Sequence, residues 1–354
     1  DWFFSKDKEN ITNMIKALRE SGLEIEPEHD MAGFLGVLID RNNEKGHYTL
    51  TQVGLIERII TSLELNGAKG KKTPAEHGAL PADKDGEACN ESFNYSSIVG
   101  MMSYLSGHTR PELEFAVHQC GRYSHNPRAI HEAALKRIGR YLVNTRDKGI
   151  ILTPTSDLKI DCFVDADFAG LWSYENPNDP VCVRSRTGYV IMFCGVPIIW
   201  KSKLQTEITL STMEAEYVAL SMAMKELLPV REFIIEVCES VGLSRNDLTS
   251  IHSTVWEDNA GCAILANMEL PRMTPRSKHY AVKYHWFRSK LKPNPLAELF
   301  VMSCLEVCNC CRCYACRVHW FQPWVCGNNK SGMRKIGIVC RWHCEGKISV
   351  AAIS

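Results

Sequence analysis

The stretch LKIDCFVDADF, residues 158–168, alternates apolar and polar side chains and ends in two closely spaced aspartates. Such alternation is typical of a β-strand that has one face in the core and the other toward solvent. The pattern therefore predicts a half-buried strand that brings Asp165 to its end.

The segments that follow predict how a sheet is completed around this strand. TGYVIMFCG and PIIWKSK predict a hairpin centred on residues 195–197. Ser211–Glu214 matches a capping box in which Glu214 reaches back to the cap, so a long helix is expected from Ser211 onward. STVWEDN predicts another strand, and a further helix is expected to begin at Asn259. The order strand, hairpin, helix, strand, helix predicts an α/β layer fold with a mixed sheet.

Three acidic stretches in this region suggest a metal site: VDADFAG at residues 164–170, STMEAEYVAL at 211–220 and WEDNAG at 256–261. In the expected fold, Asp165, Glu216 and Asp258 can converge on one edge of the sheet. Carboxylates that lie so close repel one another unless a cation neutralises them. Mg²⁺ prefers oxygen ligands, and a pair of such ions can activate water for attack on a phosphodiester. We therefore expect two Mg²⁺ ions, with Mn²⁺ as a substitute.

A simpler interpretation applies to each acid taken singly, because carboxylates are common at strand ends and helix starts without any metal. We interpret the neighbouring acids Asp167 and Glu214 in this way, as a supporting residue and a helix cap. No cluster of cysteine or histidine accompanies the three acids, which disfavours zinc. The common context of the three stretches is what favours a shared site.

Composition limits the class of protein. The chain has 354 residues, with 41 basic and 41 acidic side chains, so net charge alone indicates no polyanionic partner. Residues 270–292, however, carry seven Lys or Arg and no acid, which suits a phosphate-facing edge and equally a solvated helix face. No apolar run approaches the roughly 20 residues that span a bilayer, and the first residues do not resemble a signal peptide. We expect an intracellular protein without a membrane segment.

The upstream part of the chain is expected to be mainly helical. Residues 10–21 predict an amphipathic helix and FLGVLID, residues 34–40, a strand. LTQVGLIERIITSLEL, residues 50–65, predicts a helix, and a linker rich in Gly, Lys and Pro follows from residue 67 to about 90. Three more helices are predicted at about 95–107, 111–125 and 131–145.

Several unusual motifs occur in one order and together resemble a known family. VDADFAG, SRTGYV, WKSKLQTEITLSTMEAEYVAL, EDNAGCAILAN and SKHYAVKYHWFR resemble the ribonuclease H domain of copia-type retrotransposon Pol polyproteins. Upstream, FLGVLIDR, YSSIVGMMSYLSGHTRPELEFAVHQCGRYSHNP and ALKRIGRYLVNTRDKG resemble the part of those polyproteins that follows the reverse-transcriptase active site. The resemblance covers about residues 1–292.

The resemblance implies four segments. These are a C-terminal remnant of the reverse-transcriptase palm at 1–47, a thumb- or connection-like helical region at 48–150, a ribonuclease H-like mixed sheet with flanking helices at 157–292, and a divergent cysteine-rich tail at 293–354. The polymerase aspartates of the family are expected at or just before residue 1. We therefore expect that this chain does not polymerise DNA by itself.

The resemblance also implies the reaction, which is metal-dependent hydrolysis of the RNA strand of RNA–DNA hybrids. Carried over position by position, it assigns metal binding to Asp165, Glu216 and Asp258, with Glu216 rather than Glu214 as the glutamate of the EAEY motif. The expected partners are the hybrid and the remainder of the Pol polyprotein. Oligomeric state, and location in cytoplasm, virus-like particle or nucleus, stay open. Expected contacts to the nucleic acid are Arg184, Arg186, Lys201, Lys203, Lys278, His279 and Lys283.

The C-terminal end departs from the family pattern. The family's fourth carboxylate lies in a LADIF-like segment, for which LAELF offers Glu298, but the strand expected before that segment is missing from the sequence pattern. An active nuclease that uses Glu298 and a non-catalytic nucleic-acid-binding remnant are therefore both open. Nine of the sixteen cysteines lie between Cys304 and Cys344, and their spacing matches no regular C-x-x-C pair of pairs. Because the composition changes abruptly where the family pattern breaks, a degenerate or out-of-frame extension is favoured over a zinc site.

Overall fold

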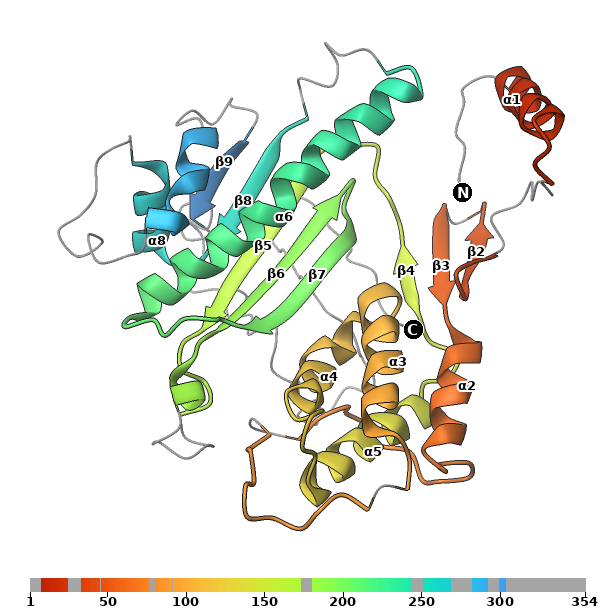
Figure 1. Ribbon diagram of the computed structural model, residues 1–354. Helices are drawn as coiled ribbons and strands as arrows, with labels where there is room; N and C mark the ends of the chain where they lie inside the picture. Colours follow the sequence, from red (N-terminus) through yellow and green to blue (C-terminus); the bar gives the residue numbers. More distant parts are fainter. Residues whose placement is uncertain are drawn as a thin grey trace, which may run out of the picture.

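A computed structural model describes residues 8–24, 33–44, 46–76, 80–90, 92–172, 180–243, 251–268, 282–291 and 299–303. Two sheets and two hydrophobic cores organise these residues (Figure 1). One core lies between the larger sheet and the helices beside it, and the other lies within a group of helices formed by the first half of the chain. In the part of the chain that the structure describes, no helix is both long and apolar enough to cross a membrane.

The larger sheet has five strands in the order β7-β6-β5-β8-β9. The predicted first strand is β5, Ile160–Asp167, and it pairs antiparallel with β6, Arg186–Phe193, which pairs antiparallel with β7, Val196–Leu204. On its other side β5 runs parallel to β8, Ser253–Glu257, which runs parallel to β9, Leu299–Ser303. The expected mixed α/β sheet is therefore present, and β5 is its central strand.

Helix α6, Thr212–Ser240, crosses one face of this sheet (Figure 1). The alternate residues Ile160, Cys162 and Val164 of β5 are buried in the same core as α6 residues such as Tyr217 and Leu220. Helix α8, Ala260–Asn267, and the short helices η4, Val282–Tyr284, and η5, Trp286–Lys290, complete the core at the β8–β9 end. Burial of alternate positions thus fixes which face of β5 meets the helix.

The hairpin between β6 and β7 turns one or two residues earlier than its sequence predicts. Cys194 and Gly195 occupy the turn with φ values of 50° and 77°, while Val196 pairs with Phe193 and Pro197 with Met192. Two left-handed residues give the two-residue turn whose twist matches that of the flanking strands. Pro197 is tolerated because β7 is the outer strand of the sheet.

The smaller sheet is antiparallel and has the order β1-β2-β3-β4. Its strands are β1, Gly33–Phe34, β2, Val37–Asn42, β3, His47–Thr51, and β4, Ile150–Leu152. The single strand expected from FLGVLID is in fact two strands, because Leu35 and Gly36 form another left-handed turn with φ values of 50° and 79°. Leu50 and Thr51, which the sequence suggested as the start of a helix, belong to β3 because they pair with neighbouring strands.

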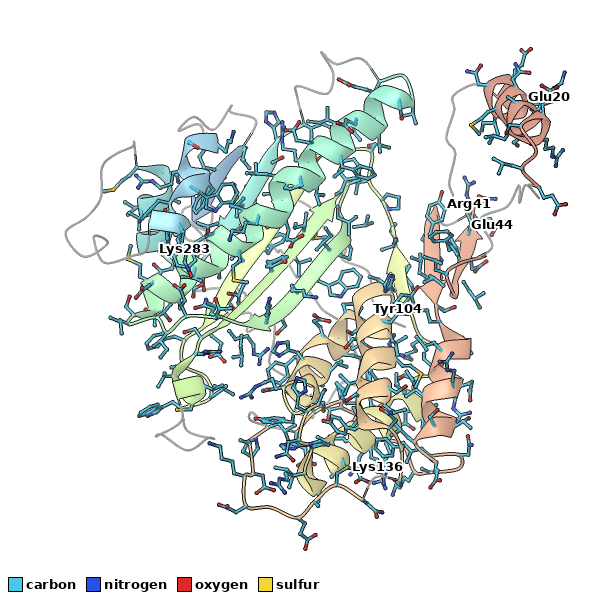
Figure 2. The ribbon with its side chains drawn as sticks, viewed as in Figure 1. Glu20, Arg41, Glu44, Tyr104, Lys136 and Lys283 are labelled. Carbon is cyan, nitrogen blue, oxygen red and sulfur yellow. The ribbon has the colours of Figure 1, made fainter. Side chains whose placement is uncertain are left out.

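Within the described residues, five α-helices belong to the first half of the chain. They are α1, Lys8–Glu20, α2, Val53–Ser62, α3, Tyr95–His108, α4, Glu114–Gly121, and α5, Ala129–Val143. The helix expected at 111–125 is shorter, since Pro111–Leu113 forms a 3₁₀ turn, η1, before α4 begins. Helices α2 to α5 share the second core. Tyr104, labelled on α3 in Figure 2, donates a hydrogen bond of 2.8 Å from its hydroxyl to the Leu35 carbonyl and so joins the helices to the β1–β2 turn.

The helical part meets the larger sheet along β7. The indole Nε1 of Trp200 donates to the Ser106 carbonyl of α3 at 2.8 Å, and Lys201 lies 3.6 Å from Glu114 of α4. Arg186 of β6 reaches the same helix, where its Nη1 lies 3.2 Å from His118 Nδ1 and its guanidinium stands 5.0 Å from the Phe115 ring centroid. Trp200 is thus a packing residue between β7 and α3 and not a free aromatic platform.

Strand β9 is a fifth strand of the larger sheet and lies beyond residue 292, where the sequence predicted the mixed-sheet domain to end. Leu299–Ser303 pairs along the whole length of β8, from Ser253 opposite Leu299 to Glu257 opposite Ser303. The strand therefore uses the last two residues of LAELF and the three that follow, beyond residue 292. Its apolar side chains explain the placement, because Leu299 and Val301 are buried in the core shared with α6 and α8.

Candidate metal centre

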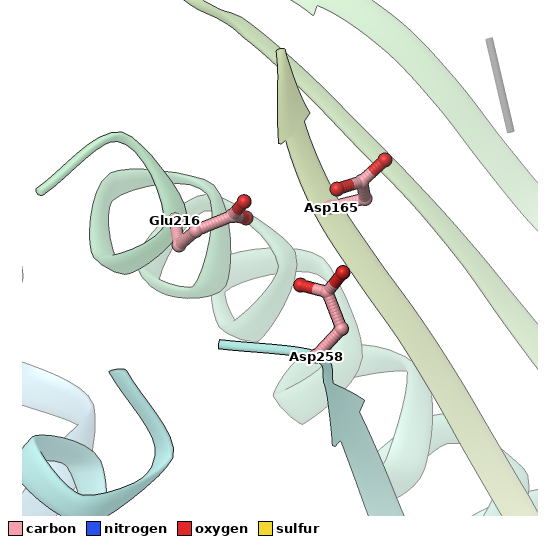
Figure 3. A group of neighbouring side chains, drawn as sticks. All are labelled: Asp165, Glu216 and Asp258. Carbon is pink, nitrogen blue, oxygen red and sulfur yellow. The ribbon is translucent and has the colours of Figure 1, made fainter. Parts of the chain in front are cut away.

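Three carboxylates meet at one edge of the larger sheet (Figure 3). Asp165, Glu216 and Asp258 each offer a ligand oxygen, and these oxygens lie within 4.8 Å of one another. Within the described residues, no other group of three or more acidic, histidine or cysteine side chains has this geometry. Asp258 is exposed, Asp165 is half-buried and Glu216 is buried, so the group is open to solvent on one side and enclosed on the other. The sequence prediction that these three residues converge is confirmed.

Each carboxylate owes its position to a different element. Asp165 lies in β5, two residues before the strand ends, so it is inside the strand and not at its last residue. Asp258 directly follows β8 and precedes Asn259, whose side chain caps α8 by accepting from the Cys262 backbone N–H at 3.0 Å. Parallel pairing of β5 with β8 brings Asp165 and Asp258 to the same edge, since Val164 is opposite Glu257.

Glu216 comes from the start of the second turn of α6. Ser211 caps the helix, and its hydroxyl accepts from the Glu214 backbone N–H at 3.1 Å. The Glu214 carboxylate accepts from the backbone N–H of Leu210 at 2.8 Å, not from that of Ser211 as the capping-box pattern predicts. Glu214 therefore stabilises the start of the helix, which is the capping role predicted for it, although its partner is Leu210. Glu216 is the residue that faces the strand ends.

Asp167 contacts the turn that follows β5, in agreement with the supporting role that the sequence suggested. A Cβ atom placed on Gly170 would lie only 1.9 Å from the Asp167 carboxylate, so this carboxylate folds back over the turn that follows β5. The glycine of VDADFAG is needed for this close approach. Asp167 is accordingly directed to its own loop, and it is absent from the group of mutually close ligand oxygens.

The electrostatics of the cluster favour a bound cation. Burial, together with the nearby carboxylates of Glu257, Asp165 and Asp258, raises the pKa of Glu216 to about 10, while the Ala166 backbone amide acts in the opposite direction. Glu216 Oε2 is buried and has no hydrogen-bond partner among the described residues. Without a cation the charged form of this carboxylate is strongly disfavoured. A divalent ion among the three groups would supply both the missing partner and the missing charge, so this acidic triad can bind a metal ion.

Glu257 is a further acid beside the triad, and sequence reasoning missed it. It is fully buried, its Oε1 accepts from the Asn259 backbone N–H at 3.0 Å, and its Oε2 has no hydrogen-bond partner in the described structure. Burial, together with the charges of Asp258 and Asp165, raises its pKa to about 8, although the hydrogen bond from the Asn259 backbone lowers it. Strand alternation could have indicated it, because Ser253, Val255 and Glu257 share the buried face of β8. Glu257 does not belong to the group of mutually close ligand oxygens.

The basic residues expected to contact nucleic acid fall into three groups. Lys201 and Lys203 of β7 are exposed, Lys283 is exposed and pairs with Glu207, and Arg184 is half-buried. The predicted nucleic-acid contact of Arg186 does not fit its position, because only 4% of this residue is exposed. Arg186 packs between β7 and α4 and donates to the Ser202 hydroxyl at 3.3 Å. Lys278, His279 and Glu298, together with residues 304–354 of the cysteine-rich tail, lie outside the described residues.

Comparison with known proteins relates most of the chain to mobile genetic elements. The chain is 30% identical over 278 residues to a retrovirus-related Pol polyprotein from transposon RE2 of Arabidopsis thaliana, which covers 78% of this chain and 18% of that protein. It is 32% identical over 271 residues to the Pol polyprotein from transposon TNT 1-94 of Nicotiana tabacum, which covers 75% of this chain and 19% of that protein. The chain thus spans about a fifth of the length of these relatives.

A shorter relative covers a smaller part of the chain. A protein of Plasmopara viticola named secreted RxLR effector protein 161 is 38% identical over 132 residues, which are 37% of this chain and 87% of that protein. No family model matches the chain.

Proposed function

Because this chain is distantly homologous to copia-type retrotransposon Pol polyproteins over most of its length, we propose that it carries the ribonuclease H activity of such a polyprotein. The reaction is metal-dependent hydrolysis of the RNA strand of an RNA–DNA hybrid. In this proposal the larger sheet with α6 and α8 is the ribonuclease H-like domain, and the helical region at 48–150 is the thumb or connection. The remainder of the polyprotein is the expected partner.

The observation that carries the proposal is the triad of Asp165, Glu216 and Asp258, whose ligand oxygens lie within 4.8 Å of one another. The three residues fit a hard divalent cation because they offer only oxygen ligands and because Glu216 Oε2 is buried without a partner among the described residues. Mg²⁺ is the proposed ion, with Mn²⁺ as its substitute. When bound, such ions activate water and stabilise the leaving oxygen of a phosphodiester.

The roles of the residues follow from their exposure. Glu216 holds the ion from the buried side, while Asp258, at the exposed side, is where a substrate phosphate would approach. Asp165 joins the two from the central strand β5. Glu257 keeps the Asn259 backbone N–H bonded and so fixes the turn that carries Asp258. RNA would be distinguished from DNA through its 2′-hydroxyls, and the hybrid would be held by its phosphates.

A second candidate function, hybrid binding without cleavage, is favoured by the register of β9. Leu299, the first described residue after Glu298, is opposite Ser253, whereas the triad lies beyond the other end of β8. None of the five residues of β9 is acidic. The described part of this strand therefore supplies no fourth carboxylate beside Asp258.

A cleavage assay separates the two candidates. A hybrid with a labelled RNA strand is incubated with the chain in Mg²⁺, alongside Asp165→Asn purified in the same way, an EDTA control and an all-DNA duplex of the same sequence. The proposal predicts RNA fragments from the wild-type chain only, and from the hybrid only. Equal background from wild type and Asp165→Asn would refute it, and hybrid binding without cleavage would establish the second candidate.

A further inference from the structure

The segment that connects β7 to α6, residues 205–211, buries its polar side chains and exposes its apolar ones. Gln205 and Thr209 are buried and Glu207 is half-buried, whereas Ile208 is 46% exposed and Leu210 is 83% exposed. Leu210 is the most exposed large apolar side chain in the part of the chain that the structure describes. A surface loop ordinarily has the opposite arrangement, so the outward apolar face of this segment calls for an explanation.

The inward polar side chains fix the segment beside the acidic triad. Gln205 donates from Nε2 to the carbonyl of Ala215, the residue before Glu216, at 2.8 Å. Glu207 accepts from the Tyr284 hydroxyl at 2.8 Å. Because these bonds tie the segment to α6 and to the short helix η4, its apolar side chains are held outward and cannot collapse onto the core.

A third apolar side chain joins them through one buried hydroxyl. Ser185 is fully buried, and its Oγ lies 2.8 Å from Thr209 Oγ1 and accepts from the Ala169 backbone N–H at 3.3 Å. The turn that follows β5 is therefore held against the segment that precedes α6. Phe168, the neighbour of Ala169 in this turn, is 39% exposed. The three exposed side chains form what we call the apolar rim: Phe168, Ile208 and Leu210.

The apolar rim lies at the same edge of the larger sheet as the triad. Phe168 follows Asp165 closely, directly after the end of β5, and Leu210 comes just before the start of α6, which carries Glu216. A phosphodiester bound at the triad would have its neighbouring nucleotides pass over this edge. The 2′-hydroxyls that mark an RNA strand lie in the wide, shallow minor groove of an A-form helix, so the site must approach the hybrid from that groove.

The chemistry of the rim suits sugars and base edges and not phosphates. Its three side chains carry no charge, and Glu207, the only acid of residues 205–211, pairs with Lys283. Apolar side chains are known to enter minor grooves and pack against the groups exposed there. Such a contact releases no counterions, so its contribution to affinity does not depend on salt in the way that a phosphate contact does.

We propose that the apolar rim packs in the minor groove of an RNA–DNA hybrid beside the scissile phosphate and favours the hybrid over a DNA duplex. This inference rests on the proposed function and deepens it by naming residues that select its substrate. The minor groove of B-form DNA is only about 6 Å wide, whereas that of an A-form helix is wide and shallow enough to admit a row of bulky side chains. Leu210 is the main contact because its side chain has the most surface to bury.

The test measures binding by the full chain silenced for cleavage with Asp165→Asn. Fluorescence anisotropy in Mg²⁺ gives the dissociation constants of a labelled RNA–DNA hybrid and of the all-DNA duplex of the same sequence, with and without added Leu210→Gln or Ile208→Thr. Each substitution should weaken hybrid binding about fivefold, because an aliphatic side chain that is buried in the complex becomes polar. The slope of log K against log salt should stay that of the parent, and affinity for the DNA duplex should not change.

Two variants serve as controls. Phe233→Gln changes another exposed apolar residue of α6, 64% exposed and about 25 Å along the helix from Glu216 at 1.5 Å per residue, and should alter neither affinity. Leu210→Met keeps an apolar side chain of similar volume and should bind the hybrid as the parent does. Urea unfolding of all variants should give the parent's midpoint, since the substituted side chains are exposed.

Hybrid affinities of Leu210→Gln and Ile208→Thr equal to that of Phe233→Gln would overturn the proposal. Equal losses on the hybrid and on the DNA duplex would also overturn it, because the rim would then not select between them. Light scattering tests a second copy of the chain as the occupant: a change of oligomeric state in Leu210→Gln with unchanged hybrid affinity would make the rim a protein interface and refute the groove contact.

Failure of the rim and failure of the proposed hydrolysis give different results. If the wild-type chain cleaves the hybrid and Leu210→Gln cleaves it with the same kcat/KM and binds it equally well, the rim is refuted and the proposed function stands. If the wild-type chain does not cleave, but Leu210→Gln selectively weakens hybrid binding, the rim is supported while the proposed hydrolysis is refuted.

Discussion

Replacement of Glu216 by Gln should stabilise the metal-free protein, although it removes a proposed metal ligand. The Glu216 carboxylate is buried, and its pKa rises from 4.5 to about 10 in the folded chain. Between these two values the folded state holds a proton that the unfolded state has lost. Stability contributed by this group is therefore complete below about pH 4.5 and is lost progressively as the pH rises toward 10.

The size of this effect on stability follows from the difference between the working pH and the pKa of Glu216 in the unfolded chain. Since pH 7 lies about 2.5 pH units above the unfolded pKa, and one unit corresponds to about 1.4 kcal/mol, Glu216 lowers the free energy of unfolding by about 3 kcal/mol at pH 7. Gln has nearly the same shape and does not titrate. Glu216→Gln should thus raise the free energy of unfolding by up to about 3 kcal/mol at pH 7 in EDTA, and by less than about 1 kcal/mol at pH 5.

Urea unfolding followed by circular dichroism, at pH 5, 6, 7 and 8 in EDTA, measures this difference. Glu232→Gln is the control, because Glu232 is an exposed acid of the same helix with 72% of its side chain accessible. In excess Mg²⁺ the order should reverse, since only the wild-type triad gains the stabilisation of a bound ion. A difference between Glu216→Gln and wild type that does not change from pH 5 to pH 8 in EDTA would refute the reasoning.

Three further predictions concern the metal ligands, the helix cap and the contact between the two cores. Loss of a group that supports a metal ligand weakens metal binding roughly 10- to 100-fold. Asp258→Asn removes a proposed ligand and should weaken Mg²⁺ binding, measured by calorimetry, by more than this range. Glu257→Gln should weaken it by less than this range, because Glu257 is outside the triad. Ser211→Ala should lower the free energy of unfolding by about 1 kcal/mol in urea, since it removes the acceptor for the Glu214 N–H, and an unchanged midpoint would contradict the cap. Trp200→Phe should cost about 1 kcal/mol by the same measurement, because it leaves the Ser106 carbonyl without its 2.8 Å donor, and no loss would mean that the bond contributes nothing to docking β7 on α3.

Local sequence patterns were sufficient for the central strand and for the convergence of the triad. Alternation along β5 and the capped start of α6 each depend on neighbouring residues only, so Asp165 and Glu216 could be placed from the sequence. The turns were harder to place, because Cys194 and Leu35 adopt left-handed φ values that the residue types do not favour.

Contacts between distant segments were not predictable in the same way. The sequence predicted Arg186 as a nucleic-acid contact, but Phe115 and His118 of α4 cover it, and His118 lies 68 positions away in sequence. Glu257 was overlooked because a charged residue is usually taken as exposed, whereas the alternation of β8 puts it on the buried face. Strand β9 depends on apolar residues that join the core after the family pattern has broken off.

Cleavage of the RNA strand by three pairs of neighbouring variants tests the central claim most directly. Each pair compares a triad residue with an acid beside it: Asp165→Asn with Asp167→Asn, Glu216→Gln with Glu214→Gln, and Asp258→Asn with Glu257→Gln. If the triad holds the catalytic metal, the first variant of each pair loses Mg²⁺-dependent cleavage of a labelled hybrid, and the second retains it. Equal rates within the pairs, whether both are active or both are inactive while the wild type cleaves, would contradict the assignment of the metal site to Asp165, Glu216 and Asp258.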